Sequence, residues 1–304
     1  MTIPFPTAAT LTAAIALAAS PVLSQDATPV SALQAPDARD GEYAEVNDAR
    51  IFYEARGDGP PVVLLHGYPL SGALFARLRD GLEDSYTVIT LDHRGYGLSE
   101  APGTPDSVVT YAGDALAVMD ELGIEQAAIG GMSMGGPIVF EMFRQAPERF
   151  SSIILIDTIA APASPAEAGL WQGMAEMVRS DGVGGIIPVL LPDMLTGQTR
   201  QDEPGVVDYL TAVMEGASED AAIGGAIALA ERPDSTPTLA EIEVPTLVLV
   251  GLADPVYSFE IAQGMADAIG ENAEVAIIEG ASHAAVFEAP AEAAAAISDF
   301  LADG

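Results

Sequence analysis

From about residue 42 onward, short apolar runs alternate with segments whose apolar positions recur at helical spacing. The apolar runs are rich in Val, Ile and Leu and end in turns that contain Gly, which is typical of strands buried on both faces. We expect strands at about residues 43–46, 49–56, 61–67, 86–95, 126–131, 151–157, 245–255 and 273–283. We expect helices at about residues 71–82, 107–122 and 135–147, and a last helix after residue 283.

Strands that alternate with helices form βαβ units, so the pattern predicts an α/β fold with a mostly parallel central sheet and helices on both faces. Residues 158–243 break the alternation, because they show helical spacing, Gly and Pro but no convincing strand. We interpret this segment as a helical cap inserted between two strands, over the sheet edge where ligands bind. Apolar side chains that either line this cap or form its core are Trp171, Met174 and Met177.

The first 24 residues contain an apolar span at about residues 8–19, followed by Pro21 and small residues. This resembles a secretory signal cleaved before Gln25 and predicts export to the periplasm or the medium. The span is too short to cross a membrane, and no Lys or Arg precedes it, so an uncleaved or disordered leader is the alternative. Residues 25–40 are polar, contain Pro and show no period, which predicts a linker ahead of a domain at residues 41–304.

The composition permits a large core and restricts the partners. At 304 residues and 49% hydrophobic content, the chain is long enough for one large domain. Its 45 acidic residues face 11 basic ones, all Arg, which gives a net charge of −34. This charge disfavours nucleic acid and stable association with anionic membranes, since both require cationic side chains. The sequence has no Cys, which excludes disulfides, thiolate metal sites and Cys nucleophiles.

One serine lies in a sequence context typical of a nucleophile. GMSMG at residues 131–135 matches G-x-S-x-G between a predicted strand and a predicted helix, which indicates a nucleophile elbow. The serine of such an elbow lies in a strained turn, and a side chain at Gly131 or Gly135 would collide with neighbouring chain segments. The following helix N-terminus offers the backbone N–H of Met134 to a developing oxyanion. Ser133 is therefore the candidate nucleophile.

A serine nucleophile needs a base, and the sequence contains three histidines. His283 follows the last predicted strand, at the sheet edge where Ser133 is expected, and completes the chain order Ser, acid, His. His283 is therefore the candidate base. His66 and His93 lie in Gly-containing turns and are expected to shape those loops.

An acidic side chain must orient the imidazole of the base. Asp254 and Asp157 each end a predicted strand at the same sheet edge. Asp254 is preferred because its strand directly precedes the one that leads to His283, and Asp157 is the alternative. The backbone N–H of Tyr68, in the loop after LLHG, is expected to be the second oxyanion donor.

Five motifs in order carry a resemblance to the α/β-hydrolase superfamily over about residues 42–301: HGYPLSG, LDHRGYGLS, GMSMGG, VGLADPV and GASHAAVFEAP. HGYPL together with SMGG resembles small cofactor-free bacterial esterases and perhydrolases, and also enol-lactone hydrolases. The family's site residues that this resemblance implies are a triad of Ser133, Asp254 and His283 and an oxyanion hole from Tyr68 and Met134. It also implies that no cofactor or metal is needed.

The same residues separate the chain from other members of the superfamily. Haloalkane dehalogenases and epoxide hydrolases carry Asp at the elbow, where this chain has Ser133. The H-G-G-P-G loop of the proline iminopeptidases is replaced by a loop with Tyr68 and Pro69.

These features predict a serine hydrolase that cleaves small neutral carboxylic esters or lactones through an acyl-enzyme. Neutral substrates are expected because the basic residues of the predicted cap are outnumbered by Asp and Glu and consist of Arg179, Arg200 and Arg232. The alternatives are an enol-lactonase, a perhydrolase or haloperoxidase, and a ligand sensor that keeps the fold without turnover.

Overall fold

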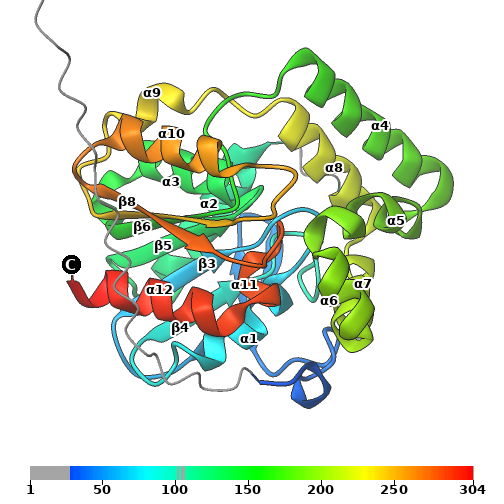
Figure 1. Ribbon diagram of the computed structural model, residues 1–304, viewed down its shortest axis with the longest axis horizontal. Coiled ribbons are helices and arrows are strands. Elements are labelled where there is room, and N and C mark those ends of the chain that lie inside the picture. Colours follow the sequence, from blue (N-terminus) through cyan, green and yellow to red (C-terminus); the bar gives the residue numbers. More distant parts are fainter. Residues whose placement is uncertain (1–27, 101–102, 104–106, 304) are drawn as a thin grey trace, which may run out of the picture.

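The computed structural model describes residues 28–100, 103 and 107–303, so the predicted signal peptide and the first residues of the predicted linker lie outside the described residues. An eight-stranded sheet with the order β1-β2-β4-β3-β5-β6-β7-β8 forms the centre (Figure 1). β2 pairs antiparallel with β1 and with β4, and all other neighbouring strands are parallel. The predicted mostly parallel α/β fold is confirmed.

The strands lie close to their predicted positions. Their bounds are β1 (Glu42–Val46), β2 (Ala49–Arg56), β3 (Pro61–Leu65), β4 (Thr87–Leu91), β5 (Ala127–Met132), β6 (Phe150–Ile156), β7 (Thr246–Gly251) and β8 (Ala273–Ile278). In β3, Val62 and Leu64 belong to one buried cluster and Val63 and Leu65 to another. Both faces of the sheet are therefore covered, which explains the continuous apolar runs in the sequence.

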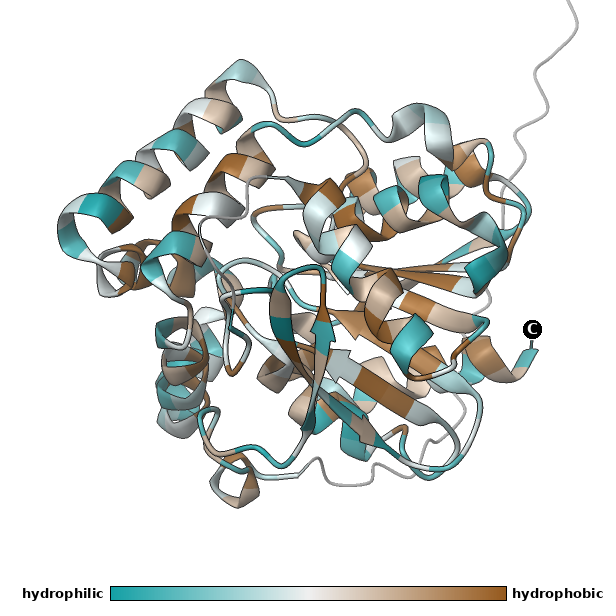
Figure 2. Ribbon diagram, turned by 180° about the vertical axis from the view of Figure 1, so that it is seen from behind, coloured by the Kyte–Doolittle hydropathy of each residue, from teal (hydrophilic) through white to brown (hydrophobic). Residues whose placement is uncertain are grey.

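Helices form the outer layers (Figure 2 shows the hydrophobic strands between them). The face that includes Val63 packs against α2 (Val108–Glu121), α3 (Gly135–Gln145) and α10 (Phe259–Ile269). The face that includes Val62 packs against α1 (Ala76–Asp80), α11 (Ala285–Glu288) and α12 (Pro290–Asp303). Within the described part of the chain, no helix has the length and apolar composition needed to cross a membrane.

Between β6 and β7 the chain forms α4 (Pro165–Asp181), α5 (Val183–Met194), α6 (Gly197–Asp202), α7 (Pro204–Glu215), α8 (Glu219–Ala230) and α9 (Thr236–Leu239). The side chains of Ser164 and Ser218 accept hydrogen bonds at the N-termini of α4 and α8, which starts these helices. α4 packs along α8 at one side of the sheet, whereas α9 lies beside α10 (Figure 1). All helices of the insertion, α4–α9, thus lie between Ile156 of β6 and Thr246 of β7, the interval in which the sequence analysis expects the cap.

The described part of the predicted linker packs against the domain, which corrects that prediction. It contains the 3-10 helix η1 (Val30–Ala32), and Val30 and Leu33 pack on a buried apolar cluster. The side chain of Arg39 is 2% exposed and forms ion pairs with Glu54 and Asp92. A buried charge with fixed partners requires a fixed backbone, so this segment belongs to the folded domain.

Candidate active site

Ser133 lies in the sharp turn between β5 and α3. Its φ is +53°, a left-handed conformation that residues other than Gly rarely adopt. Two hydrogen bonds hold the turn: the N–H of Ser133 donates to the carbonyl of Ile156 at 3.0 Å, and the hydroxyl of Thr158 donates to the carbonyl of Ser133 at 2.6 Å. These contacts, both with the neighbouring strand β6 and the loop after it, stabilise the strained conformation.

Glycines on both sides of Ser133 make room for this turn. A Cβ atom at Gly131 would lie 2.3 Å from the carbonyl oxygen of Gly135. A Cβ atom at Gly135 would lie 2.3 Å from the carbonyl oxygen of Leu65 in β3. Because the obstacles are backbone atoms, they cannot move aside as a flexible side chain can, and the elbow requires Gly at both positions.

Ser133, His283 and Asp254 form one continuous chain of hydrogen bonds. Nε2 of His283 lies 2.9 Å from Oγ of Ser133, and Nδ1 of His283 lies 2.9 Å from Oδ2 of Asp254. The other carboxylate oxygen of Asp254 accepts the N–H of Val256 at 2.7 Å. The structure thus brings together the three side chains that the sequence predicts as a triad.

The contacts of His283 determine which of its nitrogens carries the proton. A carboxylate can only accept, so Nδ1 donates to Asp254 and leaves Nε2 free to accept the hydroxyl proton of Ser133. The residues are 9% (Ser133), 2% (His283) and 7% (Asp254) exposed. The ring of Tyr257 packs edge-on against His283 at 5.6 Å between centroids, which helps to exclude water from the imidazole.

Asp157, the alternative acid, binds backbone groups instead of His283. Its two carboxylate oxygens accept the N–H groups of Gly251 at 2.8 Å and Ala285 at 3.3 Å. Burial, and then the nearby carboxylate of Asp254, raise the pKa of Asp157 well above its ordinary value. The structure therefore brings Asp254, and not Asp157, to the imidazole.

Glu288 connects the cap to the loop that carries His283, and the sequence analysis did not identify it. One carboxylate oxygen accepts the N–H of Thr196 at 2.8 Å and its hydroxyl at 2.6 Å, and the other accepts the N–H of Ser282 at 2.7 Å. The hydroxyl of Ser282 also donates to the carbonyl of Asp193 in the cap, at 2.7 Å. In the sequence, the one feature that points to Glu288 is its position five residues after His283. Nothing else distinguishes Glu288 among the 45 acidic residues.

His66 and His93 hold a loop, as the sequence analysis predicts, and neither contacts Ser133. The N–H of His93 donates to Nε2 of His66 at 2.9 Å, and Nδ1 of His66 lies 2.9 Å from the carbonyl of Gly67. Burial lowers the pKa of His66 to about 3 and lowers the pKa of His93 well below its ordinary value. Both imidazoles are therefore neutral at physiological pH.

The two candidate oxyanion donors belong to segments that adjoin Ser133. Met134 follows Ser133 directly at the start of α3. Tyr68 belongs to the loop of residues 66–72, which packs against the elbow: a Cβ atom at Gly67 would lie 2.9 Å from Cβ of Ser133. Among the described residues, no backbone acceptor is assigned to the N–H of Tyr68 or Met134. Both groups therefore remain candidates for the oxyanion hole.

The cap contributes an aromatic contact to the loop of Tyr68, and its buried arginine is neutralised. Trp171 packs edge-on against Tyr68 at 5.5 Å between centroids. Arg232 is 3% exposed, but it pairs with Glu167 at 2.7 Å and donates to two backbone carbonyls. Met174 and Met177 are packed with Trp171 against the core.

The other cap arginines lie at the surface. Arg179 pairs with Glu176 at 2.6 Å, and Arg200 is exposed on α6. None of the three cap arginines therefore offers a buried, unneutralised charge. Across residues 28–303, as far as they are described, no group of three or more His, Cys, Asp or Glu side chains is arranged to hold a metal ion.

Comparisons with known proteins agree with this fold. The sequence model of the alpha/beta hydrolase fold matches residues 60–290. The 3-oxoadipate enol-lactonase 2 of Acinetobacter baylyi is 31% identical over 252 residues, which cover 80% of this chain and 90% of that protein.

Two solved structures superpose on nearly their whole length. A thermophilic esterase from Thermogutta terrifontis, solved with malate bound, has a TM-score of 0.83 at 31% identity and covers 87% of this chain and 99% of its own. The enol-lactonase from Burkholderia xenovorans LB400 has a TM-score of 0.80 at 27% identity, and the match covers 86% of this chain and 99% of that enzyme. With its sheet, its elbow and these relatives, the chain belongs to the alpha/beta hydrolase fold family.

Proposed function

We propose that the protein is a serine hydrolase that cleaves small neutral carboxylic esters or lactones through an acyl-enzyme. The single observation that carries this proposal is the buried chain of hydrogen bonds from Asp254 through His283 to Ser133, with 2.9 Å at each contact of the imidazole. This arrangement activates a hydroxyl for attack on an acyl carbon. The esterase and the enol-lactonases among its relatives support an ester bond as the target.

In the first half of the reaction, Oγ of Ser133 attacks the carbonyl carbon while Nε2 of His283 takes the hydroxyl proton. The carbonyl oxygen becomes an oxyanion that accepts hydrogen bonds from the N–H groups of Tyr68 and Met134. The bond from the acyl carbon to the leaving oxygen then breaks, and the proton on His283 passes to that oxygen. Ser133 remains as an acyl ester.

In the second half, His283 takes a proton from water, and the resulting hydroxide attacks the acyl carbon. The acid leaves, and the proton returns to Oγ of Ser133. Asp254 stabilises the imidazolium in both halves, and its burial strengthens this interaction because the local dielectric constant is low.

The electrostatics of the cap support neutral substrates. Arg232 is the buried cap arginine, and Glu167 already neutralises it. A substrate carboxylate would have to approach a protein of net charge −34 and lose hydration without an uncommitted cation. An enol-lactonase with a carboxylated substrate is the second candidate, because relatives with that name match most of the chain.

Turnover of a chromogenic acetate ester tests the proposal. The wild type should hydrolyse the ester, also in EDTA, and Ser133→Ala or His283→Ala should lower turnover by at least about a thousandfold. Absence of turnover in the folded wild type would favour the ligand sensor. If peroxide with acetate gives faster halide oxidation than the ester gives hydrolysis, the protein is a perhydrolase.

A comparison of two lactones separates the substrate candidates. We expect a higher kcat/KM for a neutral lactone than for a carboxylated enol-lactone at equal concentration and moderate salt. A clear preference for the carboxylated compound would favour the enol-lactonase and contradict the neutral assignment.

We also propose that the protein is exported and cleaved before Gln25. This cleavage would keep residues 28–40, which pack on the domain through Arg39. Mass spectrometry of the native protein should find an N-terminus at or near Gln25. An intact Met1 in the soluble cell interior would contradict export.

A further inference from the structure

The loop of residues 66–72 is held at both ends by two adjacent residues. At its start, Nε2 of His66 accepts the N–H of His93 at 2.9 Å. At its end, the N–H of Gly72 donates to Oδ1 of Asp92 at 2.7 Å. The position of this loop against the elbow therefore depends on the side chain of Asp92.

Asp92 is a buried carboxylate in a tightly enclosed position. It is 0% exposed, and its Oδ2 also accepts the N–H of Leu98 at 2.7 Å. A Cβ atom at Gly97 would lie 2.2 Å from this oxygen, and one at Gly72 would lie 3.0 Å from Oδ1. Burial of a carboxylate in such a position is costly unless a cationic side chain pairs with it.

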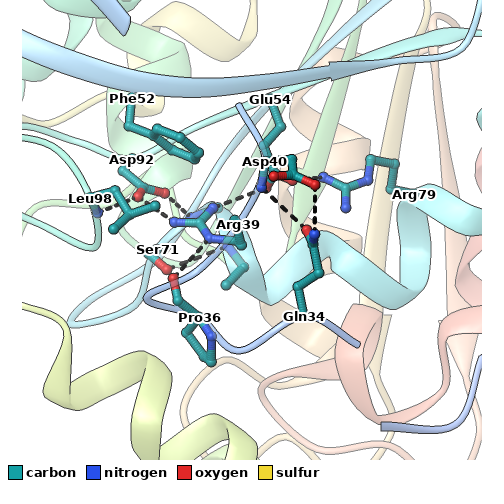
Figure 3. Close-up of polar contacts among 12 residues, drawn as sticks. Gln34, Pro36, Arg39, Asp40, Phe52, Glu54, Ser71, Arg79, Asp92 and Leu98 are labelled. Carbon is teal, nitrogen blue, oxygen red and sulfur yellow. Dashed lines mark hydrogen bonds and ion pairs between the residues drawn. The ribbon is translucent and has the colours of Figure 1, made fainter. Parts of the chain in front are cut away.

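The cation comes from the N-terminal segment. The guanidinium of Arg39 lies between Asp92 and Glu54 and bonds to both, with 3.0 Å to Oε2 of Glu54 (Figure 3). Arg79 pairs with the other oxygen of Glu54 at 2.9 Å. Two arginines thus neutralise two carboxylates, and all four side chains are at most 10% exposed.

Arg39 also touches the loop directly. A Cβ atom at Gly72 would lie 3.3 Å from Nη1 of Arg39, so the guanidinium packs against the backbone at the end of the loop. The family match begins at residue 60, and Arg39 therefore lies outside the part of the chain that the family pattern describes.

We propose that Arg39 is a positioning residue for the oxyanion hole: its ion pair holds the carboxylate of Asp92 in place, so that the loop holds the N–H of Tyr68 towards the substrate oxygen. This inference rests on the proposed function for its catalytic consequence. Residues 28–40, which we call the strap, are then a working part of the site. Without Arg39, Glu54 keeps its ion pair with Arg79, but Asp92 loses its pair with Arg39, and the hydrogen bond from Gly72 to Asp92 weakens.

Amide hydrogen exchange of the full-length protein tests the structural half of the proposal. Arg39→Met removes the charge, and Arg39→Lys keeps the charge but cannot bridge two carboxylates in the same way. Arg56→Met is the matched control, because Arg56 donates to the carbonyl of Asp40 in the strap at 2.9 Å but makes no ion pair with Asp92 or Glu54 among the described residues.

We expect residues 66–72 to exchange about tenfold faster in Arg39→Lys than in the wild type or the control, with β5 and β6 unchanged. Arg39→Lys decides the outcome if Arg39→Met does not fold. Unchanged exchange in the loop, or an equal increase in β5 and β6, would overturn the proposal, because the latter indicates only a general loss of stability.

A transition-state mimic tests the catalytic half. A boronic acid that forms a tetrahedral anion on Ser133 should bind about tenfold more weakly to Arg39→Lys than to the wild type, while KM for a neutral ester changes less than about twofold. Equal changes in both constants would overturn the role in the oxyanion hole. If the wild type neither binds the boronic acid nor turns over esters, the proposed function fails, and the exchange experiment still decides whether Arg39 positions the loop.

Discussion

Asp157 and Asp254 follow the neighbouring strands β6 and β7, and only Asp254 reaches the imidazole of His283. Asp157 is 1% exposed and binds two backbone N–H groups, from Gly251 three residues before Asp254 and from Ala285 two residues after His283. It therefore fastens together the two loops that carry Asp254 and His283. The two carboxylates have different tasks although they are close neighbours.

Substitution of the two aspartates separates these tasks. Asp254→Asn should lower kcat by about a thousandfold or more, because the imidazole loses its orienting acceptor and the stabilisation of its charge. Asp157→Asn should lower kcat by less than about tenfold, since it does not contact His283. Steady-state kinetics with a neutral ester measure both. A severe loss in Asp157→Asn with a mild loss in Asp254→Asn would reverse the assignment.

The raised pKa of Asp157 predicts a pH dependence of stability. In the unfolded chain this carboxyl ionises near its ordinary value of 3.8, whereas the folded state keeps its proton to higher pH. Its contribution to the free energy of unfolding is therefore present below pH 3.8 and is lost as pH rises towards the folded pKa. Asp157→Asn should remove this slope.

Urea unfolding across the pH range measures this effect. The free energy of unfolding of Asp157→Asn minus that of the wild type should increase as pH rises from 3.8 towards the folded pKa of Asp157, because the wild type loses stability over this range. A difference that is independent of pH would mean that Asp157 does not titrate differently in the folded and unfolded states.

Glu288 should couple the cap to the loop of His283. Glu288→Gln loses charge-assisted hydrogen bonds and should lower the free energy of unfolding by about 1.5–3 kcal/mol. In a double-mutant cycle with Thr196→Val, we expect a coupling energy of about 1 kcal/mol from urea unfolding. Glu292→Gln on α12, an exposed glutamate, is the control and should change stability by less than about 0.5 kcal/mol. Additive effects of Glu288 and Thr196 would exclude the coupling.

Two glycine substitutions test the packing of the elbow. Gly135→Ala should lower the free energy of unfolding by more than about 3 kcal/mol, because its Cβ meets the backbone of Leu65 at 2.3 Å. Gly264→Ala on α10 is the control, since its Cβ meets nothing within 4 Å, and should stabilise the protein by about 0.5–1 kcal/mol. Urea unfolding measures both values. Equal stability of the two variants would contradict the close approach of β3 to the elbow.

The sequence was sufficient to predict what depends on local pattern and rare residues. Buried strands require Val, Ile and Leu on both faces, so the pattern predicts nearly all of the sheet. Ser133 lies in a local motif, and His283 is one of three histidines, so few choices existed. The helix α10 is not among the predicted elements, although its buried positions Ala262, Met265, Ala266 and Ile269 have helical spacing.

What the sequence did not reveal depends on contacts between distant segments. Asp157 and Asp254 both end strands at the same edge, and only the three-dimensional direction of the side chains distinguishes them. Arg39 is one of 11 basic residues and Glu288 one of 45 acidic residues, and their importance arises from partners up to 92 residues away. The apolar residues of the strap do not recur at a helix or strand period, because isolated side chains such as Val30, Leu33 and Arg39 attach it to the domain.

Covalent labelling by a p-nitrophenyl alkylphosphonate tests most directly whether Ser133 is a nucleophile activated by His283. The wild type should release one equivalent of nitrophenol and gain one phosphonyl group, which peptide mass spectrometry assigns to Ser133. Ser133→Ala should remain unlabelled, and His283→Ala should react at least about a thousandfold more slowly. A folded wild type that remains unlabelled, or a Ser133→Ala variant that is labelled at the wild-type rate, would contradict the account.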